Sequence, residues 1–289
     1  MTARLVDRSW RNRFRRFVEQ KTRQAAESRL LRYVTETAAP GDDAVAIGNA
    51  WSTRLFDGPF YASPARDPRR PACSLVFVQS ADGNTVADDP ASLGGGDTDK
   101  HLIYEGLSRV AADAVLAGAE TVRDDDLVFS LWHPELVSLR ASLGLPRHPV
   151  QIVATLRGVD LDRMLLFNVP AVPAVVLTVG PAARQMRDAV SARPWVTLLT
   201  METPEALPEA FEQLRTLGIA RISCIGGRKI AQRLLDATLI DDVYLTTGTR
   251  AGGEPGTPLS PAAWRGRVIV RKHGTGAEAG VFFEHLSPR

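Results

Sequence analysis

The sequence has few of the residues that a disulfide framework, a zinc site or a clustered catalytic centre would require. Its two cysteines, Cys73 and Cys224, lie far apart and form no CxxC motif, which disfavours a disulfide scaffold and a zinc site. The five histidines are scattered along the chain, and no GxSxG motif marks a nucleophilic serine. These absences argue against nucleophilic catalysis and against a resident metal.

Long apolar runs are also missing. No stretch approaches the ~20 apolar residues that span a bilayer, and no secretory hydrophobic segment stands near the start. The formal net charge of the 289 residues is only +2, so the chain as a whole has no nucleic-acid signature. With 44% hydrophobic and 24% charged residues, the composition is that of an ordinary globular protein. We therefore expect a cytoplasmic protein with no membrane partner.

Positive charge is concentrated at the N-terminus, where residues 1–32 hold ten Arg and Lys against three acidic residues. We expect a helix that docks an apolar stripe on its own domain or on a second subunit and turns its arginines to water. A helix for nucleic acid or an anionic surface, or a targeting segment, is the alternative. The stripe at helical spacing consists of Trp10, Phe14, Phe17, Lys21 and Ala25.

Apolar strand patterns alternate with helical patterns through most of residues 73–250. This alternation predicts an α/β fold with a mainly parallel sheet, and residues 267–286 predict an antiparallel C-terminal hairpin. Residues 40–72 are rich in Pro, Gly and Asp, which predicts a loop or linker. The expected strands span residues 72–80, 112–121, 148–155, 173–180, 221–227 and 241–249, and the expected helices residues 100–111, 203–218 and 228–239.

Two consecutive glycines, Gly226 and Gly227, separate an expected strand from an expected helix. Ligands of parallel sheets bind beyond the carboxyl ends of the strands, and glycine lets a ligand approach the backbone closely. The start of a helix adds free N–H groups and the positive end of its dipole, and Arg228 and Lys229 add charge. The pattern favours a seat for a pyrophosphate; a tight turn without a ligand is the alternative.

Polar residues also follow two other strands. Thr155 and Arg157 suit the 2′-phosphate of an adenosine ribose, because guanidinium is a planar fork for phosphate oxygens; a solvated arginine is the alternative. Ser80, Asp82 and Asn84 lie in a loop that can close over a reactive cofactor face, or form a simple Asp-Gly turn. No GxGxxG motif follows a strand, so the usual Rossmann fingerprint is absent.

Gly118 ends another buried strand, and Thr121 is placed to cap a turn or contact a phosphate. The run Asp124, Asp125 and Asp126 follows directly. A metal site is disfavoured there, because three consecutive residues cannot all face one ion and no other ligand stands at suitable spacing.

Together these stretches resemble the reductase domain of the riboflavin-biosynthesis pyrimidine reductase family, whose fold is similar to that of dihydrofolate reductase. The resemblance covers roughly residues 72–286. It implies a dihydrofolate-reductase-like three-layer α/β fold, NADPH as hydride donor, a small heterocyclic substrate and a homodimer. The matching segments are Ser80–Gly83, the Arg-to-Val stretch from Arg109 to Val122, the acidic pair Asp125 and Asp126, and Gly226–Gly227.

The resemblance divides the chain and implies roles for individual residues. Residues 1–71 would be a basic helical N-terminal extension and linker, and residues 72–289 the reductase domain. The implied cofactor-binding residues are Gly118, Thr121, Thr155, Arg157, Gly226, Gly227, Arg228 and Lys229. The implied catalytic residues are Ser80, Asp82 and Asp126, and the substrate would lie against Ser80, Asn84, Asp125, Asp126, Ile225 and Trp132.

Three departures from the family pattern bear on the substrate. The family Glu before the two glycines is Ile225, the Pro after the acidic pair is Leu127, and the Arg that would hold a ribose phosphate is missing from the stretch around Trp132. Losing an Arg–phosphate pair removes charge-assisted hydrogen bonds of ~1.5–3 kcal/mol each. A changed substrate pocket beside a retained cofactor seat would account for this. The alternatives are a reductase of a pterin-like heterocycle and a nucleotide-binding homologue without catalysis.

Overall fold

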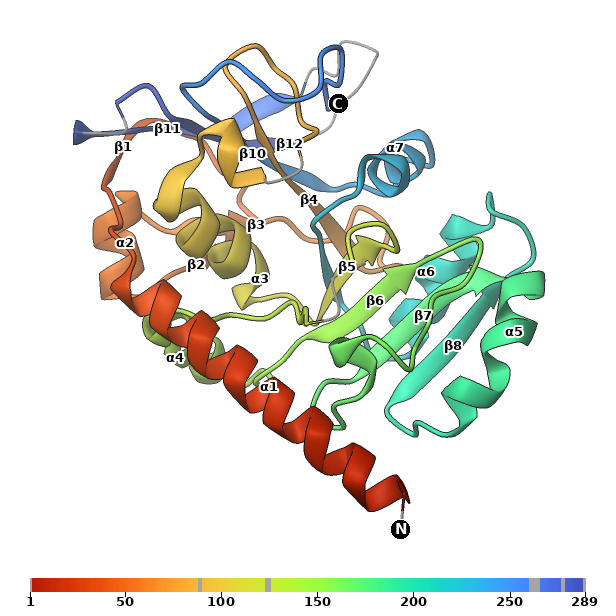
Figure 1. Cartoon of the computed structure of the whole chain (residues 1–289). Helices are drawn as coiled ribbons and strands as arrows, with labels where there is room; N and C mark the ends of the chain where they lie inside the picture. Colours follow the sequence, from red (N-terminus) through yellow and green to blue (C-terminus); the bar gives the residue numbers. More distant parts are fainter. Residues whose placement is uncertain (1, 88–89, 123–125, 260–265, 277–278, 288–289) are drawn as a thin grey trace.

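The chain folds around one ten-stranded sheet with the strand order β1-β11-β12-β10-β4-β9-β5-β6-β7-β8 (Figure 1). The computed structural model describes residues 2–87, 90–122, 126–259, 266–276 and 279–287. Strands β10, β4, β9, β5, β6, β7 and β8 run parallel to one another. Their bounds are Asp242–Thr247, Ala72–Gln79, Arg221–Cys224, Ala114–Gly118, Val150–Ala154, Ala174–Val179 and Val196–Met201.

The other side of the sheet is antiparallel. Strands β11 (Arg267–Gly274) and β12 (Phe282–Ser287) pair with each other, and β12 pairs with β10. The mainly parallel sheet and the C-terminal hairpin are therefore confirmed. The sequence did not predict β1 (Tyr33–Ala38), which pairs with β11 and extends the sheet with residues of the N-terminal segment.

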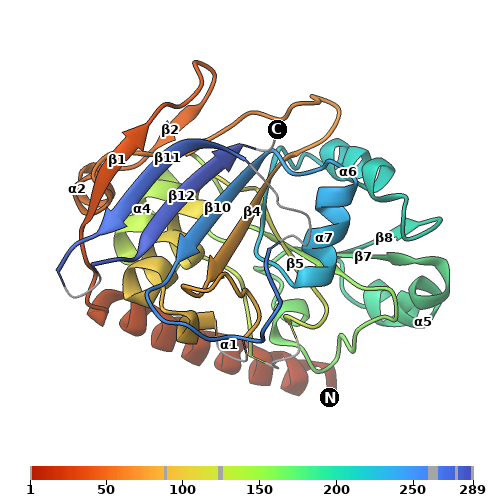
Figure 2. The same ribbon diagram turned by 90° about the horizontal axis from the view of Figure 1, so that it is seen from above.

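Helices cover both faces of the sheet, which gives three layers (Figures 1 and 2). Strand β5 shows why: Leu116 points into one buried cluster, and its neighbour Val115 points into another. This alternation is the period of two of a strand that is buried on both faces. The first cluster includes α6 (Leu207–Thr216) and α7 (Arg228–Asp236); the second includes residues of α1 (Thr2–Glu27), η3 (Leu165–Phe167) and α5 (Gly180–Ser191).

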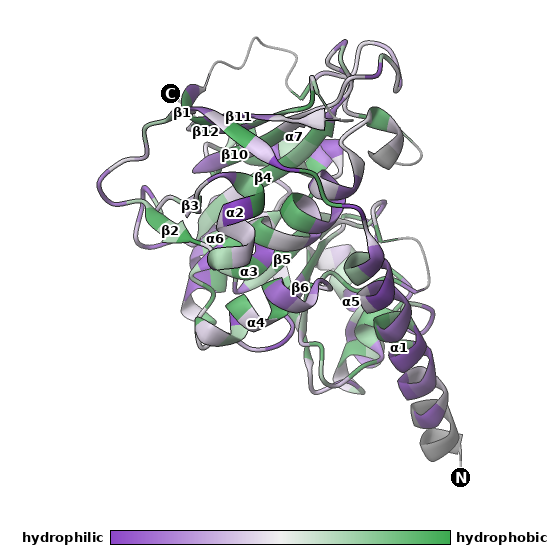
Figure 3. Ribbon diagram, turned by 90° about the vertical axis from the view of Figure 1, so that its left-hand side faces the viewer, coloured by the Kyte–Doolittle hydropathy of each residue, from purple (hydrophilic) through white to green (hydrophobic). Residues whose placement is uncertain are grey.

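Helix α1 docks on its own domain through the apolar stripe that the spacing predicts. Phe17 packs edge-on against Trp132 with ring centroids 5.3 Å apart, and Phe14 lies 5.6 Å from the ring of His148. Figure 3 shows that the coloured part of α1 is mainly hydrophilic. Lys21, in the same stripe, does not pack as the aromatic residues do; it reaches a charged partner on another helix.

Residues 40–72 are not simply a loop, and the sequence prediction is corrected here. They contain β2 (Val45–Ile47), α2 (Ala50–Phe56) and β3 (Phe60–Ala62). The reason is that Ile47, Phe56 and Phe60 are buried in a third apolar cluster. Burial of these side chains stabilises the strands and the helix more than the surrounding Pro, Gly and Asp residues favour a loop. The cluster also holds residues of η2 (Thr98–Leu107), α3 (Ser108–Val110) and α4 (Pro134–Ser142).

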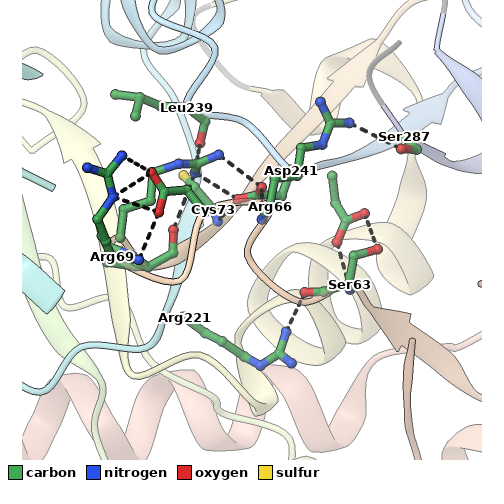
Figure 4. Close-up of polar contacts among 12 residues, drawn as sticks. Ser63, Arg66, Arg69, Cys73, Arg221, Leu239, Asp241 and Ser287 are labelled. Carbon is green, nitrogen blue, oxygen red and sulfur yellow. Dashed lines mark hydrogen bonds and ion pairs between the residues drawn. The ribbon is translucent and has the colours of Figure 1, made fainter. Parts of the chain in front are cut away.

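A buried ion pair fastens this segment to the sheet. Asp241, only 2% exposed, accepts hydrogen bonds from Arg70 at 3.0 and 3.1 Å and from the backbone of Cys73 at 2.8 Å. It also accepts one from the backbone of Arg66 at 3.0 Å. Figure 4 shows Arg66 and Cys73 at this carboxylate, and the carbonyl of Leu239, which accepts a hydrogen bond from Arg70 at 3.2 Å. The segment thus enters β4 at a position fixed by charge-assisted hydrogen bonds.

Candidate functional site

A cavity of about 1600 Å³ lies at the carboxyl ends of β4, β9, β5 and β6. Pockets for a single small ligand commonly measure ~300–1,000 Å³, so this one has room for a dinucleotide and a second molecule. Ile225 lines this cavity. The eight residues expected to bind a cofactor line it as well: Gly118, Thr121, Thr155, Arg157, Gly226, Gly227, Arg228 and Lys229.

The two glycines form a backbone cradle on one wall of the cavity. Gly226 has a φ of +104°, a conformation that L side chains rarely adopt, and its carbonyl accepts the N–H of Gly118 at 2.9 Å. Gly227 donates its N–H to Thr121 Oγ1 at 3.1 Å and precedes the first residue of α7 without a side-chain cap. The first turn of α7 therefore keeps backbone donors and the positive end of its dipole for an anion.

Two basic side chains, Lys229 and Arg228, lie beside this cradle. Lys229 forms an exposed ion pair with Glu120, with its Nζ 3.4 Å from Oε1, and such pairs hold side chains weakly. Arg228 lines the cavity from the first position of α7. Together they make the entrance to the cradle electropositive on its α7 side.

The loop after β6 brings Arg157 to the cavity. Thr155 donates its hydroxyl to the carbonyl of Gly158 at 3.0 Å and accepts the N–H of Arg157 at 3.3 Å. The hydroxyl therefore shapes the loop that presents Arg157, whose side chain is exposed. Of the two residues, Arg157 is the one with donors available to a phosphate.

The loop after β4 makes its hydrogen bonds within the protein. Ser80 is fully buried, donates to Asp82 at 2.5 Å and accepts the N–H of Asn84 at 3.1 Å. Asn84 in turn donates to the carbonyl of Gly252 at 3.0 Å. The hydrogen bond from Ser80 lowers the pKa of Asp82. None of these three side chains is among the described residues that line the cavity, and their bonds join two loops.

Two other expected substrate contacts also lie away from the cavity. Asp126 forms an ion pair with Arg13 of α1 at 2.6 Å and is half exposed, and Trp132, 1% exposed, is covered by Phe17. A substrate contact for Trp132 is thus not supported, because the indole fills the core beneath α1. Asp125 lies outside the described residues.

The structure adds a charged group that the sequence did not single out. Lys21 Nζ lies 2.9 Å from Glu105 Oε1, and both residues line the cavity. Arg109, 1% exposed, lines it as well and lies over the ring of Tyr104 at 4.8 Å. The only sequence signal was indirect: Lys21 stands in the otherwise apolar stripe of α1, and a charge in such a stripe needs a partner.

Glu105 is held ionised in the folded protein. Burial by itself would raise the pKa of its carboxyl, but contact with His101 and the charges of Lys21 and Arg109 outweigh burial and lower the pKa to about 2 from 4.5. A carboxyl with a lowered folded-state pKa stabilises the protein above its unfolded pKa, and that stabilisation fades as the pH falls toward the folded value.

The link between the pKa of Glu105 and stability can be tested by varying the pH. Glu105→Gln is expected to cost about 3 kcal/mol of unfolding free energy near neutral pH, from the size of the shift. The difference from wild type should shrink as the pH falls from about 4.5 toward 2. Urea unfolding of both proteins across this range measures it. A difference that stays constant with pH would show that the charge of Glu105 is not the cause.

The fold and the cavity define a class: a three-layer α/β protein with a glycine cradle at the carboxyl ends of parallel strands. Within that class, residues 71–263 match the RibD C-terminal domain family, and the chain belongs to this family. No curated protein matches the chain significantly.

Solved structures share this fold. A pyrimidine reductase-like protein of Corynebacterium diphtheriae superposes with a TM-score of 0.60 at 20% identity, over 76% of this chain and 92% of that one. The riboflavin biosynthesis reductase Rib7 of Saccharomyces cerevisiae gives 0.52 at 18% identity, over 77% and 92%. The Thermotoga maritima diaminohydroxyphosphoribosylaminopyrimidine deaminase/5-amino-6-(5-phosphoribosylamino)uracil reductase gives 0.56 at 19%, over 76% of this chain and 57% of that one.

Two features of the described residues bear on other classes of function. None of the helices in the described ranges is long and apolar enough to cross a membrane. The same ranges hold no group of three His, Cys, Asp or Glu side chains placed to bind a metal ion. Residues Asp124 and Asp125 of the acidic run lie outside those ranges.

Proposed function

We propose that the protein is an NADPH-dependent reductase that transfers hydride to a planar heterocycle, with 5-amino-6-(5-phosphoribosylamino)uracil as the first candidate substrate. The observation that carries this proposal is the convergence of the glycine cradle, the start of α7 and Arg157 on one large cavity. Membership of the RibD C-terminal domain family supports it, and the candidate substrate is taken from the name of the Thermotoga relative.

The residues of the cavity fit the dinucleotide. Gly226 has a φ of +104°, which disfavours any side chain there, and a Cβ on Gly227 would stand at an ordinary contact distance of 3.4 Å from Thr121 Oγ1, so both positions present bare backbone to the cavity. The uncapped start of α7 suits the diphosphate, and Arg157 suits the 2′-phosphate. Bound there, the coenzyme would supply the hydride; the chain supplies the rest.

The contribution of the chain is alignment and exclusion of water. Ile225 belongs to an apolar cluster with Phe129 and Phe17, so the wall next to the cradle is dry where the family resemblance implies a carboxylate. Holding the two reactants at contact distance supplies much of the rate enhancement of a bimolecular step. An apolar wall that excludes water also prevents side reactions of the reduced coenzyme with solvent.

The direct test is turnover. The purified protein with NADPH and 5-amino-6-(5-phosphoribosylamino)uracil is expected to consume the reduced coenzyme and form the ribitylamino product, followed by absorbance and mass spectrometry. Binding of NADPH without turnover of this substrate would instead favour a nucleotide-binding homologue or a different heterocycle. Failure to bind NADPH would overturn the proposal.

A second test concerns the 2′-phosphate. Arg157→Leu is expected to weaken NADPH binding by about tenfold or more, since charge-assisted hydrogen bonds contribute ~1.5–3 kcal/mol. NADH lacks that phosphate, so its dissociation constant should stay within about twofold of wild type. Fluorescence titration of both coenzymes measures the pair. An equal loss for both would mean that Arg157 contacts another part of the dinucleotide.

A further inference from the structure

Lys21, Glu105 and Arg109 form a charged cluster that borders the cavity on the side of η2 and α3. The side chain of Lys21 is 20% exposed and that of Glu105 10%. Of the α1 side chains that the structure describes, Lys21 alone lines the cavity. It also lies outside residues 71–263, the part of the chain that matches the family.

Several buried polar atoms of this cluster have no hydrogen-bond partner within the described part of the chain. They are Nε and Nη2 of Arg109 and Oε2 of Glu105, although Nη1 of Arg109 donates to the carbonyl of Ser130 at 3.0 Å. His101 Nδ1 lies 3.5 Å from that Oε2, beyond good hydrogen-bond distance. An unsatisfied buried donor or acceptor costs ~1–3 kcal/mol, so a native fold that keeps three in one place needs a reason.

The surroundings of these atoms suit a flat ligand. The guanidinium of Arg109 lies 4.8 Å from the ring centroid of Tyr104 and 5.6 Å from that of Phe129. Tyr104, Phe129 and Ile225 all line the cavity. The cluster therefore offers two cationic donors and one carboxylate acceptor at the border of an aromatic and aliphatic wall.

We propose that α1 completes the substrate end of the cavity and that Lys21 is a specificity residue for the amide-type edge of a planar heterocycle. Lys21 and Arg109 donate to ring carbonyls, and Glu105 accepts from the ring N–H between them. On binding, the ammonium group shifts from Glu105 toward a ring carbonyl. This inference rests on the proposed reductase function and adds to it a recognition group from outside the family domain.

The same charges disfavour a phosphate at this position. The carboxylate of Glu105 already neutralises one of the two cations, and a phosphate dianion would stand beside it. An amide edge carries no net charge and uses both kinds of group at once. The cluster therefore binds the ring, and removal of the substrate phosphate leaves its contribution unchanged.

The experiment compares Lys21→Met with wild type in two assays. Calorimetry on the NADPH-saturated protein measures binding of 5,6-diaminouracil, the ring alone. Kinetics measures KM for 5-amino-6-(5-phosphoribosylamino)uracil and for its dephosphorylated form. Lys21→Met is expected to weaken ring binding and raise both KM values about tenfold, with the NADPH dissociation constant within about twofold of wild type. Lys21→Arg should recover part of the loss.

Two controls separate recognition from folding. Arg23→Met removes an exposed charge of α1 that does not line the cavity and is expected to match wild type. Lys21→Met/Glu105→Gln removes both partners of the Lys21–Glu105 ion pair. It should still bind the ring poorly, because neither the Lys21 donor nor the carboxylate is restored, and an NADPH dissociation constant near that of wild type shows that the variant is folded.

Each outcome has one meaning. Unchanged ring binding in Lys21→Met, or a wild-type protein that does not bind the ring, would overturn the role of Lys21. A KM change confined to the phosphorylated substrate would also overturn it and assign Lys21 to the phosphate. A wild-type protein that binds the ring in a Lys21-dependent manner but turns over neither substrate would overturn the proposed reaction and leave the recognition group in place.

Discussion

Gly227→Asp is expected to weaken NADPH binding about 100-fold or more. The new carboxylate would stand at the start of α7, where we propose that the diphosphate binds. Two unit charges ~4 Å apart interact by ~4 kcal/mol at an effective dielectric constant of 20, and 1.4 kcal/mol corresponds to a tenfold change in affinity. Fluorescence titration with NADPH measures the effect, and NADH should be affected equally, because both coenzymes carry the diphosphate.

The substitution should not damage the fold. Gly227 has no left-handed φ, and an added Cβ would meet Thr121 Oγ1 at 3.4 Å, an ordinary contact distance. Aspartate is also a preferred N-cap residue and interacts well with the helix dipole. Gly227→Asp should therefore melt at or above the wild-type temperature. Gly227→Ala, which adds a Cβ without charge, is the matched control and should lose far less affinity. Unchanged affinity in the Asp variant would place the coenzyme elsewhere.

The cradle was predictable from sequence because its signal is local. A strand, two glycines and a helix follow one another within residues 221–236, and parallel strands bring their carboxyl ends to one edge of the sheet. The same reasoning brought Gly118, Thr121 and Arg157 to this edge, and the structure has them all along one cavity. Strand β8 and helix α5 were missed, although they only extend the pattern already found.

The far side of the cavity was not predictable in this way. Lys21 and Glu105 are 84 residues apart in sequence, and no local pattern records which turn of α1 faces which turn of η2. The substrate contact predicted for Trp132 has the same limitation. Its position after the acidic run favoured such a contact, whereas the docking of α1, which the sequence does not encode locally, buries the indole. The identity of a long-range neighbour depends on the packing of whole elements, which composition and periodicity do not contain.

Asp241→Asn is expected to cost about 3–5 kcal/mol of unfolding free energy, the range for breaking a buried ion pair by removing one partner. Arg70 is 8% exposed and makes two hydrogen bonds to this carboxylate, so the variant would leave a buried guanidinium without an anion. The free energy of unfolding of a typical domain is ~5–15 kcal/mol, so this loss would be a large share of the total stability. Urea unfolding measures it. Asp67→Asn, at the exposed pair with Arg69, is the control and should change little.

The double variant Arg70→Met/Asp241→Asn decides whether the charge or the hydrogen bonds of Asp241 matter more. If the uncompensated guanidinium dominates, replacing it with an apolar side chain should make the double variant more stable than Asp241→Asn alone. If the backbone bonds from Cys73 and Arg66 dominate, the second substitution should recover nothing, because an asparagine oxygen accepts less strongly than a carboxylate. We expect the first result, since the amide oxygen of Asn can still accept one of these backbone bonds. Asp241 does not line the cavity, so NADPH affinity of the folded double variant should equal that of wild type.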